Sequence, residues 1–158
     1  MAVYKRKDRD KWFARIVGAN GRAVSKTFER KSDAVRWEAE QLATRDRGDW
    51  IDPRDGKVTF ADFYRDWSAR QVWESNTTLS MNLSARLTTF SDIPLARIRR
   101  SHVEVWVKSM TTAGLAPSTI KTRFNNVHAV FRAAVRDRFI ASDPSLGITP
   151  RYLLDQAR

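Results

Sequence analysis

The first part of the chain alternates apolar and polar residues with the period of β-strands. Lys11–Val17 and Ala23–Phe28 are rich in aromatic and branched side chains, and the Asn-Gly pair in Gly18–Gly21 suits a hairpin turn between them. Val3–Lys5 predicts a third, shorter strand. Apolar residues then recur every three or four positions from Lys31 to about Asp46, which predicts a helix. We therefore expect a small three-stranded antiparallel sheet with one helix packed on it, spanning residues 1–46.

From Val58 onward the apolar periodicity is helical throughout. Four stripes at three- and four-residue steps predict four helices. Their expected inward residues are Phe60, Phe63, Tyr64 and Trp67; Leu79, Leu83 and Leu87; Val103, Trp106, Val107 and Met110; and Ile120, Phe124, Val127, Phe131, Ala134 and Val135. The expected helix-entry residues are Ser32, Thr59, Ser101 and, at the first position of the last helix, Pro117. Short loops then predict a separate all-α domain at 58–148.

The stretch between these two parts, Arg47–Lys57, contains two glycines, a proline and many charged side chains. Its apolar residues Trp50 and Ile51 follow no period, so we expect an interdomain linker at 47–57. Residues 149–158 are expected to begin a second linker. The predicted fold class is therefore α+β, with a sheet-plus-helix domain followed by an all-α four-helix domain.

The charge of the chain indicates a polyanionic partner. Its 158 residues carry 29 basic and 18 acidic side chains, a net charge of +11. Residues 1–57 hold 15 basic and 10 acidic side chains, and residues 58–158 hold 14 and 8, so both parts are basic. The chain has no cysteine, and neither His102 nor His128 lies in a metal-ligand pattern. We expect no cofactor, no metal, no membrane span and no secretory signal, and hence a cytoplasmic protein.

Two of the predicted helices have polar faces without acidic residues, which suit nucleic acid. The candidate DNA contacts of the helical domain are Asn76, Thr77, Ser80, Ser84 and Arg86 on its second helix, and Ser118, Lys121, Thr122, Asn125 and Asn126 on its fourth. The asparagines suit adenine edges, and Lys121 suits guanine or phosphate. On the uncovered sheet face the candidates are Arg15, Arg22, Lys26 and Thr27, although the sequence does not fix which strand residues face outward.

Several blocks, taken in order, carry a family resemblance. In the helical part they are Thr59–Trp67 (TFADFYRDW), Thr77–Met81 (T-x3-M), Phe90–Ile98 (FSDIPLARI), Leu115–Ile140 and Asp143–Ile148 (DPSLGI). Their order and spacing resemble the core-binding domain of phage integrases of the tyrosine recombinase family. Lys11–Ile16 (KWFARI) and Lys26–Glu40 resemble, over a shorter stretch, the integrase arm-binding domain.

This resemblance implies a fold and a partner. It implies a SAM-like four-helix domain that clamps the crossover-site duplex, and a sheet domain that grips separate arm sites. One protomer would then bridge arm-type and core-type double-stranded DNA during integration or excision of phage DNA in a bacterial host. We expect a monomer on its own, because assembly in this family relies largely on the catalytic domain.

The residues that the family uses for catalysis have no match in this chain. The family's catalytic domain supplies an arginine-rich pocket, a lysine, an H-x-x-R motif and a tyrosine nucleophile. Here Val105 and Phe131 stand three positions after His102 and His128, and Tyr152 comes too early in the chain to be that tyrosine. We therefore expect a non-enzymatic chain that corresponds to the N-terminal part of a longer recombinase.

Other interpretations stay open at this point. The chain could be a natural DNA-binding regulator derived from a recombinase, or a non-specific architectural or RNA-binding protein. Paired carboxylates such as Asp62/Asp66 or Glu38/Glu40 could in principle hold magnesium for hydrolysis. Asp62 and Asp66 are one turn apart on an outer helix face, however, which is more typical of solvated charge. Polar helix and sheet faces are also most often only solvated.

Overall fold

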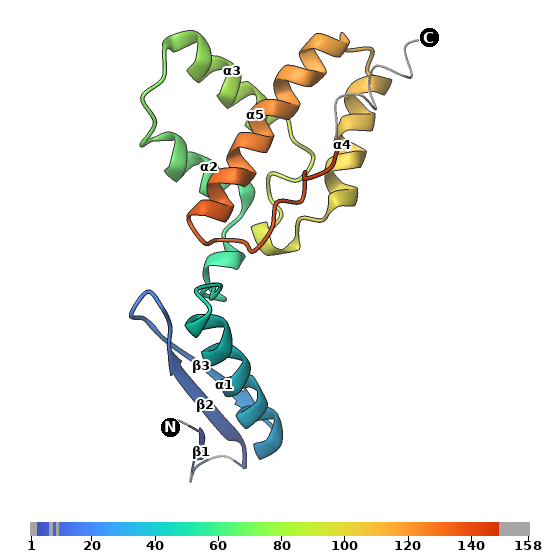
Figure 1. Ribbon diagram of the computed structural model, residues 1–158. Coiled ribbons are helices and arrows are strands. Elements are labelled where there is room, and N and C mark those ends of the chain that lie inside the picture. The colour runs from blue at the N-terminus through green and yellow to red at the C-terminus, as the bar shows by residue number, and fades with distance from the viewer. Residues whose placement is uncertain (1–2, 7, 9, 149–158) are drawn as a thin grey trace. The chain divides into compact units, whose positions relative to one another are not determined.

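The computed structural model describes residues 3–6, 8 and 10–148, and shows an α+β chain with three strands and five α-helices in this part (Figure 1). The predicted linker at 149–158 lies outside the described residues. Contacts divide the chain between Asp52 and Pro53 into two compact units. Residues 47–52 of the predicted interdomain linker belong to the first unit, and residues 53–57 belong to the second.

The first unit is the expected small sheet with one helix. Strands β1 (Val3–Lys5), β2 (Trp12–Val17) and β3 (Ala23–Phe28) are antiparallel in the order β1-β2-β3, and helix α1 spans Lys31–Asp46. The predicted bounds of α1 are confirmed. Its N-cap is Arg30 in extended conformation and not Ser32, since the first helical turn already includes the serine.

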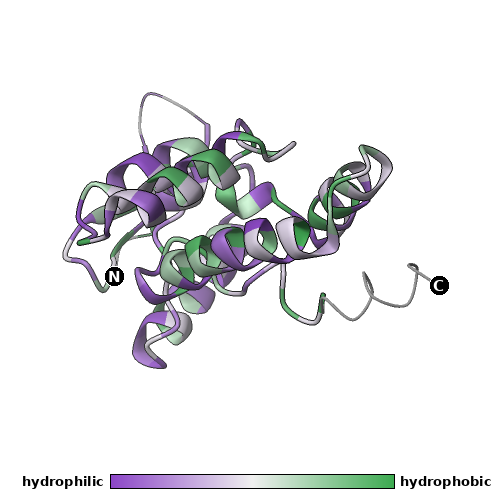
Figure 2. Cartoon of the chain, turned by 90° about the horizontal axis from the view of Figure 1, so that it is seen from above, coloured by the Kyte–Doolittle hydropathy of each residue, from purple (hydrophilic) through white to green (hydrophobic). Residues whose placement is uncertain are grey.

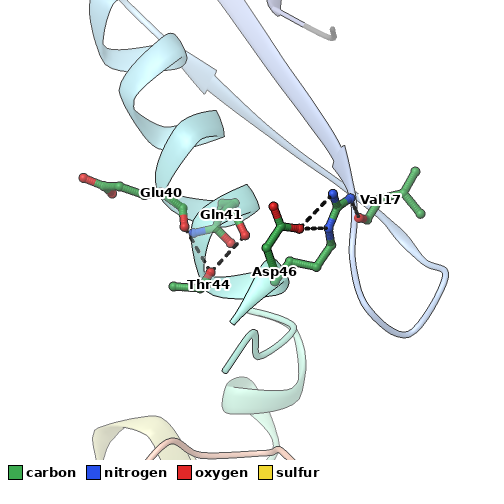
Figure 3. Close-up of polar contacts among 6 residues, drawn as sticks. Val17, Glu40, Gln41, Thr44 and Asp46 are labelled. Carbon is green, nitrogen blue, oxygen red and sulfur yellow. Dashed lines mark hydrogen bonds and ion pairs between the residues drawn. The ribbon is translucent and has the colours of Figure 1, made fainter. Parts of the chain in front are cut away.

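The C-terminal end of α1 is fastened to the end of β2. Arg45, in the last turn, donates from Nη1 to the carbonyl oxygen of Val17 at 3.2 Å and pairs with Asp46 at 3.3 Å (Figure 3). The Thr44 hydroxyl donates to the backbone carbonyl oxygens of Glu40 and Gln41 in the same helix. The contact with Val17 holds the helix against the strand that it covers.

The tryptophan of the predicted linker completes the first unit. Trp50 is 5% exposed and donates from Nε1 to Gln41 Oε1 at 3.0 Å. Its ring fills the space beside Gly18, where an added Cβ would lie 2.0 Å from the ring. Asn20 of the same hairpin turn donates to Asp52 at 3.1 Å. Burial of this large ring draws residues up to Asp52 onto the β2–β3 turn.

The second unit contains four α-helices around one apolar core. They are α2 (Phe60–Ser68), α3 (Ser75–Arg86), α4 (Arg100–Thr112) and α5 (Pro117–Arg136), with short 3-10 turns η1 (Asp55–Lys57) and η2 (Leu95–Arg97). Helix α5 packs against α2, α3 and α4, and is therefore the central helix. The alternation of hydrophobic and hydrophilic positions along the helices can be followed in Figure 2. No helix among the described residues is long and apolar enough to cross a membrane.

Most inward residues expected from the periodicity are buried. Trp106, Phe60, Phe131, Val103 and Val127 are among the largest fully enclosed side chains, and the loop anchors Phe90 and Leu95 are enclosed with them. Thr59 caps α2 as expected, because its hydroxyl accepts the backbone N–H of Asp62 at 3.1 Å. Pro117 is the first residue of α5, also as expected. The expected N-cap Ser101 is replaced by Arg99, whose backbone N–H donates to His102 Nδ1 at 2.9 Å.

Helix α3 presents a different face to the core from the one predicted. Leu79, Leu83 and Leu87 were expected inward, yet they are 68%, 38% and 44% exposed. The helix instead buries Met81, Ser84 and Ala85. The physical reason is the close approach of α3 to α5 at Ser80 and Ser84, which both accept hydrogen bonds from Asn126 and leave no room there for a leucine.

Candidate nucleic-acid interface

Helix α5 carries a polar, basic stripe along its solvent side. Ile120, Phe124, Val127 and Phe131 point into the core, which turns the opposite side outward. The outward residues, which we call the α5 stripe, are Ser118, Lys121, Thr122, Asn125, Arg132 and Arg136, and all six are exposed. The α5 stripe therefore includes four of the five residues predicted on this helix.

Arg132 and Arg136 were missed as candidates. They continue the line of Lys121 and Asn125 towards the C-terminal end of the helix, so the helical period already contained the signal. Among the described residues, no ion pair engages either arginine or Lys121. Helices α3 and α5 together carry five basic side chains and no acidic one. Their positive charge is therefore available to an external anion.

Asn126, the fifth predicted residue of α5, faces α3. Its Nδ2 donates to Ser80 Oγ and to Ser84 Oγ, both at 3.0 Å. Ser84 is 2% exposed, and its hydroxyl donates to the backbone carbonyl oxygen of Ser80 at 2.8 Å. The predicted exposure of Ser84 is wrong, because that residue lies in the contact between the two helices. These three residues form a polar link across what we call the α3–α5 seam.

The remaining predicted residues of α3 are accessible. Asn76, Thr77 and Arg86 are exposed, and the leucines lie among them. Tyr64 of α2 donates to Asn82 Oδ1 at 2.7 Å, which ties α2 to α3. Burial raises the pKa of the Tyr64 phenol above its ordinary value. The exposed surface of α3 is thus both polar and apolar, unlike the α5 stripe.

In the first unit the strand register decides which sheet residues face away from α1. Ala14 and Ile16 are buried on the side of the helix. Because paired residues of antiparallel strands share a face, Lys26, opposite Ala14, lies on the helix side. Arg15 pairs with Ser25, and Phe13 pairs with Thr27, so these four lie on the other side.

We call that other side the open sheet face. Tyr4 of β1 lies opposite Phe13, and their rings stack with centroids 6.0 Å apart. Arg15 and Thr27 are on this face as predicted, whereas the predicted placement of Lys26 is wrong. Arg22 lies in the hairpin turn, where its backbone N–H donates to Asn20 Oδ1 at 3.0 Å. The open sheet face therefore combines this aromatic pair with Arg15 and the hydroxyls of Ser25 and Thr27, and the Arg6 guanidinium lies over the Phe13 ring, 5.4 Å from its centroid.

Comparison with known proteins supports the architecture. No family model and no curated protein matches the sequence of this chain. A solved lambda integrase dimer bound to a COC′ core site is similar in structure, with a TM-score of 0.54 over 94% of this chain and 16% identity. This chain has an integrase-like fold. It spans 44% of the length of the matched integrase chain.

One cluster in the integrase-like second unit contains the residue types of a hydrolase triad. His128 Nδ1 lies 2.7 Å from Ser145 Oγ and 3.0 Å from Asp143 Oδ2. A catalytic triad needs serine and carboxylate on opposite ring nitrogens, whereas both groups here meet the same one. Ser145 is 1% exposed and donates from both its backbone and its hydroxyl to Asp143 Oδ1. The cluster therefore anchors the segment after α5 to that helix.

The described residues offer no metal centre. No group of three or more His, Cys, Asp or Glu side chains in this part of the chain could hold a metal ion. Asp62 and Asp66, considered above as a magnesium pair, both bind Arg65, at 3.0 and 3.1 Å, on the surface of α2. Their carboxylates are therefore engaged with a cation of the chain itself.

Proposed function

We propose that this chain binds double-stranded DNA sequence-specifically, as the arm-binding and core-binding region of a phage integrase. The observation that carries the proposal is the surface of α3 and α5, which has five basic side chains and no acidic one. The integrase-like fold supports it, since the similar structure is that of a lambda integrase on a COC′ core site. The chain would act in the cytoplasm of a bacterial host during site-specific recombination.

In this proposal the second unit, as a SAM-like core-binding domain, contacts a core-type site. Lys121, Arg132 and Arg136 lie on the exposed line of α5 at a spacing that lets them meet phosphates. Asn125 lies on the same line and is the best placed amide to pair with an adenine edge. Asn126 holds α3 and α5 together and does not read a base.

The first unit would contact a second, arm-type site through the open sheet face. A small sheet can enter the major groove, and Arg15, Ser25 and Thr27 present a cation and two hydroxyls there. The aromatic pair of Tyr4 and Phe13 borders these groups. Two such surfaces on one chain would let a single protomer bridge two DNA segments.

We further propose that this chain does not cleave DNA. His102 and His128 are not followed by the arginine of an H-x-x-R motif. His128 lies against Asp143 and Ser145, and His102 accepts the backbone N–H of Arg99, the N-cap of α4, so both have structural partners. The chain would position DNA as a monomer, and strand exchange would need a catalytic domain.

The testing experiment is DNase footprinting of the full chain on attachment-region duplexes, with random duplex and RNA as competitors at several salt concentrations. We expect footprints at two kinds of site. Arg15→Ala with Thr27→Ala should remove one kind, and Lys121→Ala with Arg132→Ala should remove the other. Lys121→Ala alone should reduce the slope of log K against log salt by about one unit. Equal competition by cognate DNA, random DNA and RNA would refute sequence-specific binding and favour a non-specific basic protein.

A further inference from the structure

Helix α3 carries a row of leucines that no other described part of the chain covers. Leu79, Leu83 and Leu87 are one turn apart and are 68%, 38% and 44% exposed. A single exposed leucine is ordinary, but three on one line of a helix make a continuous apolar surface. We call these three residues the leucine row. Such a row is typical of a surface that another molecule covers.

The leucine row lies on the same surface as the α5 stripe. The α3–α5 seam is fixed by the hydrogen bonds from Asn126 to Ser80 and Ser84. One side of the seam is the core, where Met81 and Ala85 are buried. By helical spacing from Ser80, Ser84 and Asn126, the other side of the seam is bordered by Leu83 and Leu87 of α3 and by Thr122, Asn125 and Ala129 of α5. All of these side chains are exposed except Ala129, which is half-buried. A ligand that lies over this side of the seam therefore meets Leu83 and Leu87 together with the polar residues of α5.

The charge around the leucine row selects the class of ligand. Arg86 lies on the exposed side of α3, and Lys121, Arg132 and Arg136 lie along α5, with no acidic side chain on either helix. An apolar protein surface would cover the leucines but leave this positive charge without a counterpart. Duplex DNA satisfies both requirements, because its phosphates are anionic and its major groove displays one apolar group, the 5-methyl of thymine.

We propose that Leu83 and Leu87 contact thymine 5-methyl groups in the major groove and so help to determine which core-type sequence the second unit binds. The proposal rests on the DNA binding proposed above and adds a specificity determinant to it. In this arrangement the Asn125 amide pairs with the amino group and ring nitrogen of an adenine edge, while the two leucines contact methyl groups on neighbouring base pairs. The exposed leucines are then part of the recognition surface.

The experiment replaces thymine by uracil, which lacks only the 5-methyl group. The full chain is first used to select a duplex from a randomised pool of 40-bp DNA. The selected duplex is then synthesised with deoxyuridine at each thymine in turn. Removing one buried methyl should weaken binding by about fourfold, and we expect this at one or two positions. Other positions should be unaffected.

The leucine variants connect that effect to α3. Leu83→Ala and Leu87→Ala should each weaken binding to the thymine duplex by a similar factor. Each should also abolish the difference between thymine and uracil at one position. The matched control is Val105→Ala, which shortens an apolar side chain that is 62% exposed on α4. That variant should retain the full thymine preference.

The outcomes separate this inference from the proposed function. If the pool yields a defined sequence but every deoxyuridine duplex binds as well as the thymine duplex, the leucine contacts are refuted and DNA binding stands. If no sequence is enriched, both proposals fail. If the leucine variants keep the thymine preference and lose self-association in sedimentation, a second copy of the chain covers the leucine row, and the inference is overturned.

Discussion

The adjacent residues Asn125 and Asn126 provide a matched pair of substitutions that separates DNA contact from helix packing. Both lie in the middle of α5, one exposed and the other hydrogen-bonded to Ser80 and Ser84 at 3.0 Å. Replacing either by alanine gains up to about 0.7 kcal/mol of helix propensity. That gain is the same at both positions, so it cancels when the two variants are compared.

The expected difference in stability follows from the two hydrogen bonds. Each contributes about 1 kcal/mol, so Asn126→Ala should be about 2 kcal/mol less stable than Asn125→Ala. With a denaturant slope of about 2 kcal/mol/M, their urea midpoints should differ by about 1 M. Asn125→Ala should equal or slightly exceed the unsubstituted chain in stability, because its side chain is exposed.

The assay needs a probe that belongs to the second unit alone. Trp106 is 1% exposed and donates from Nε1 to the carbonyl oxygen of Leu87 at 3.2 Å, so its indole N–H resonance reports the folded second unit. Urea titrations followed by this resonance give the free energy of unfolding of that unit. Equal midpoints for the two variants would refute the polar link across the seam.

The same pair predicts opposite behaviour in DNA binding. At a temperature where both variants are folded, Asn125→Ala should lose about 1–3 kcal/mol on a selected duplex and little on random duplex. Asn126→Ala should retain the difference between the two duplexes. An equal loss for Asn125→Ala on selected and random DNA would show that Asn125 contacts only the backbone.

Three further predictions concern stability. Trp50→Ala should destabilise the first unit by about 3–5 kcal/mol, because it removes a large buried ring. Gly18→Ala should displace the Trp50 ring and so change the chemical shift of the Trp50 indole N–H. An unchanged chemical shift in Gly18→Ala would contradict the close contact between Gly18 and the ring. Thr59→Ala should cost the second unit about 1 kcal/mol in urea titrations, whereas Thr59→Ser should cost little, because the hydroxyl caps α2. Because burial raises the pKa of Tyr64 above its ordinary 10.0, the folded state holds that proton more tightly than the unfolded state. The contribution of the Tyr64 proton to the free energy of unfolding is complete below about pH 10 and declines as the pH rises further. Urea titrations at pH 9 and pH 11 should show the decline, and Tyr64→Phe should not share it.

The sequence determined the elements that depend on local chemistry and strong periodicity. The bounds of α1, the position of Pro117 at the start of α5 and the cap at Thr59 all follow from short-range requirements of the backbone. The inward face of α5 followed from its large apolar residues, which no other face could match. The integrase-like fold was also anticipated from the order of blocks along the chain.

The sheet face was decided by tertiary structure. Trp12 and Phe13 are adjacent, so each of the two faces of β2 carries an aromatic residue. The amino-acid pattern alone therefore does not indicate which face packs against α1. Pairing with β3 and packing of α1 on Ala14 and Ile16 select the face. That selection moves Lys26 to the helix side and brings Tyr4 beside Phe13 on the open sheet face.

The orientation of α3 was also decided by its neighbours. Its leucines and its small residues both recur with a helical period, so the pattern alone favours the larger apolar side chains for the core. The seam with α5 instead requires small side chains and hydrogen-bond partners for Asn126, which Ser80 and Ser84 supply. Hydrophobicity is a property of each residue, whereas the width of the gap that a helix must fill exists only once its partner is in place.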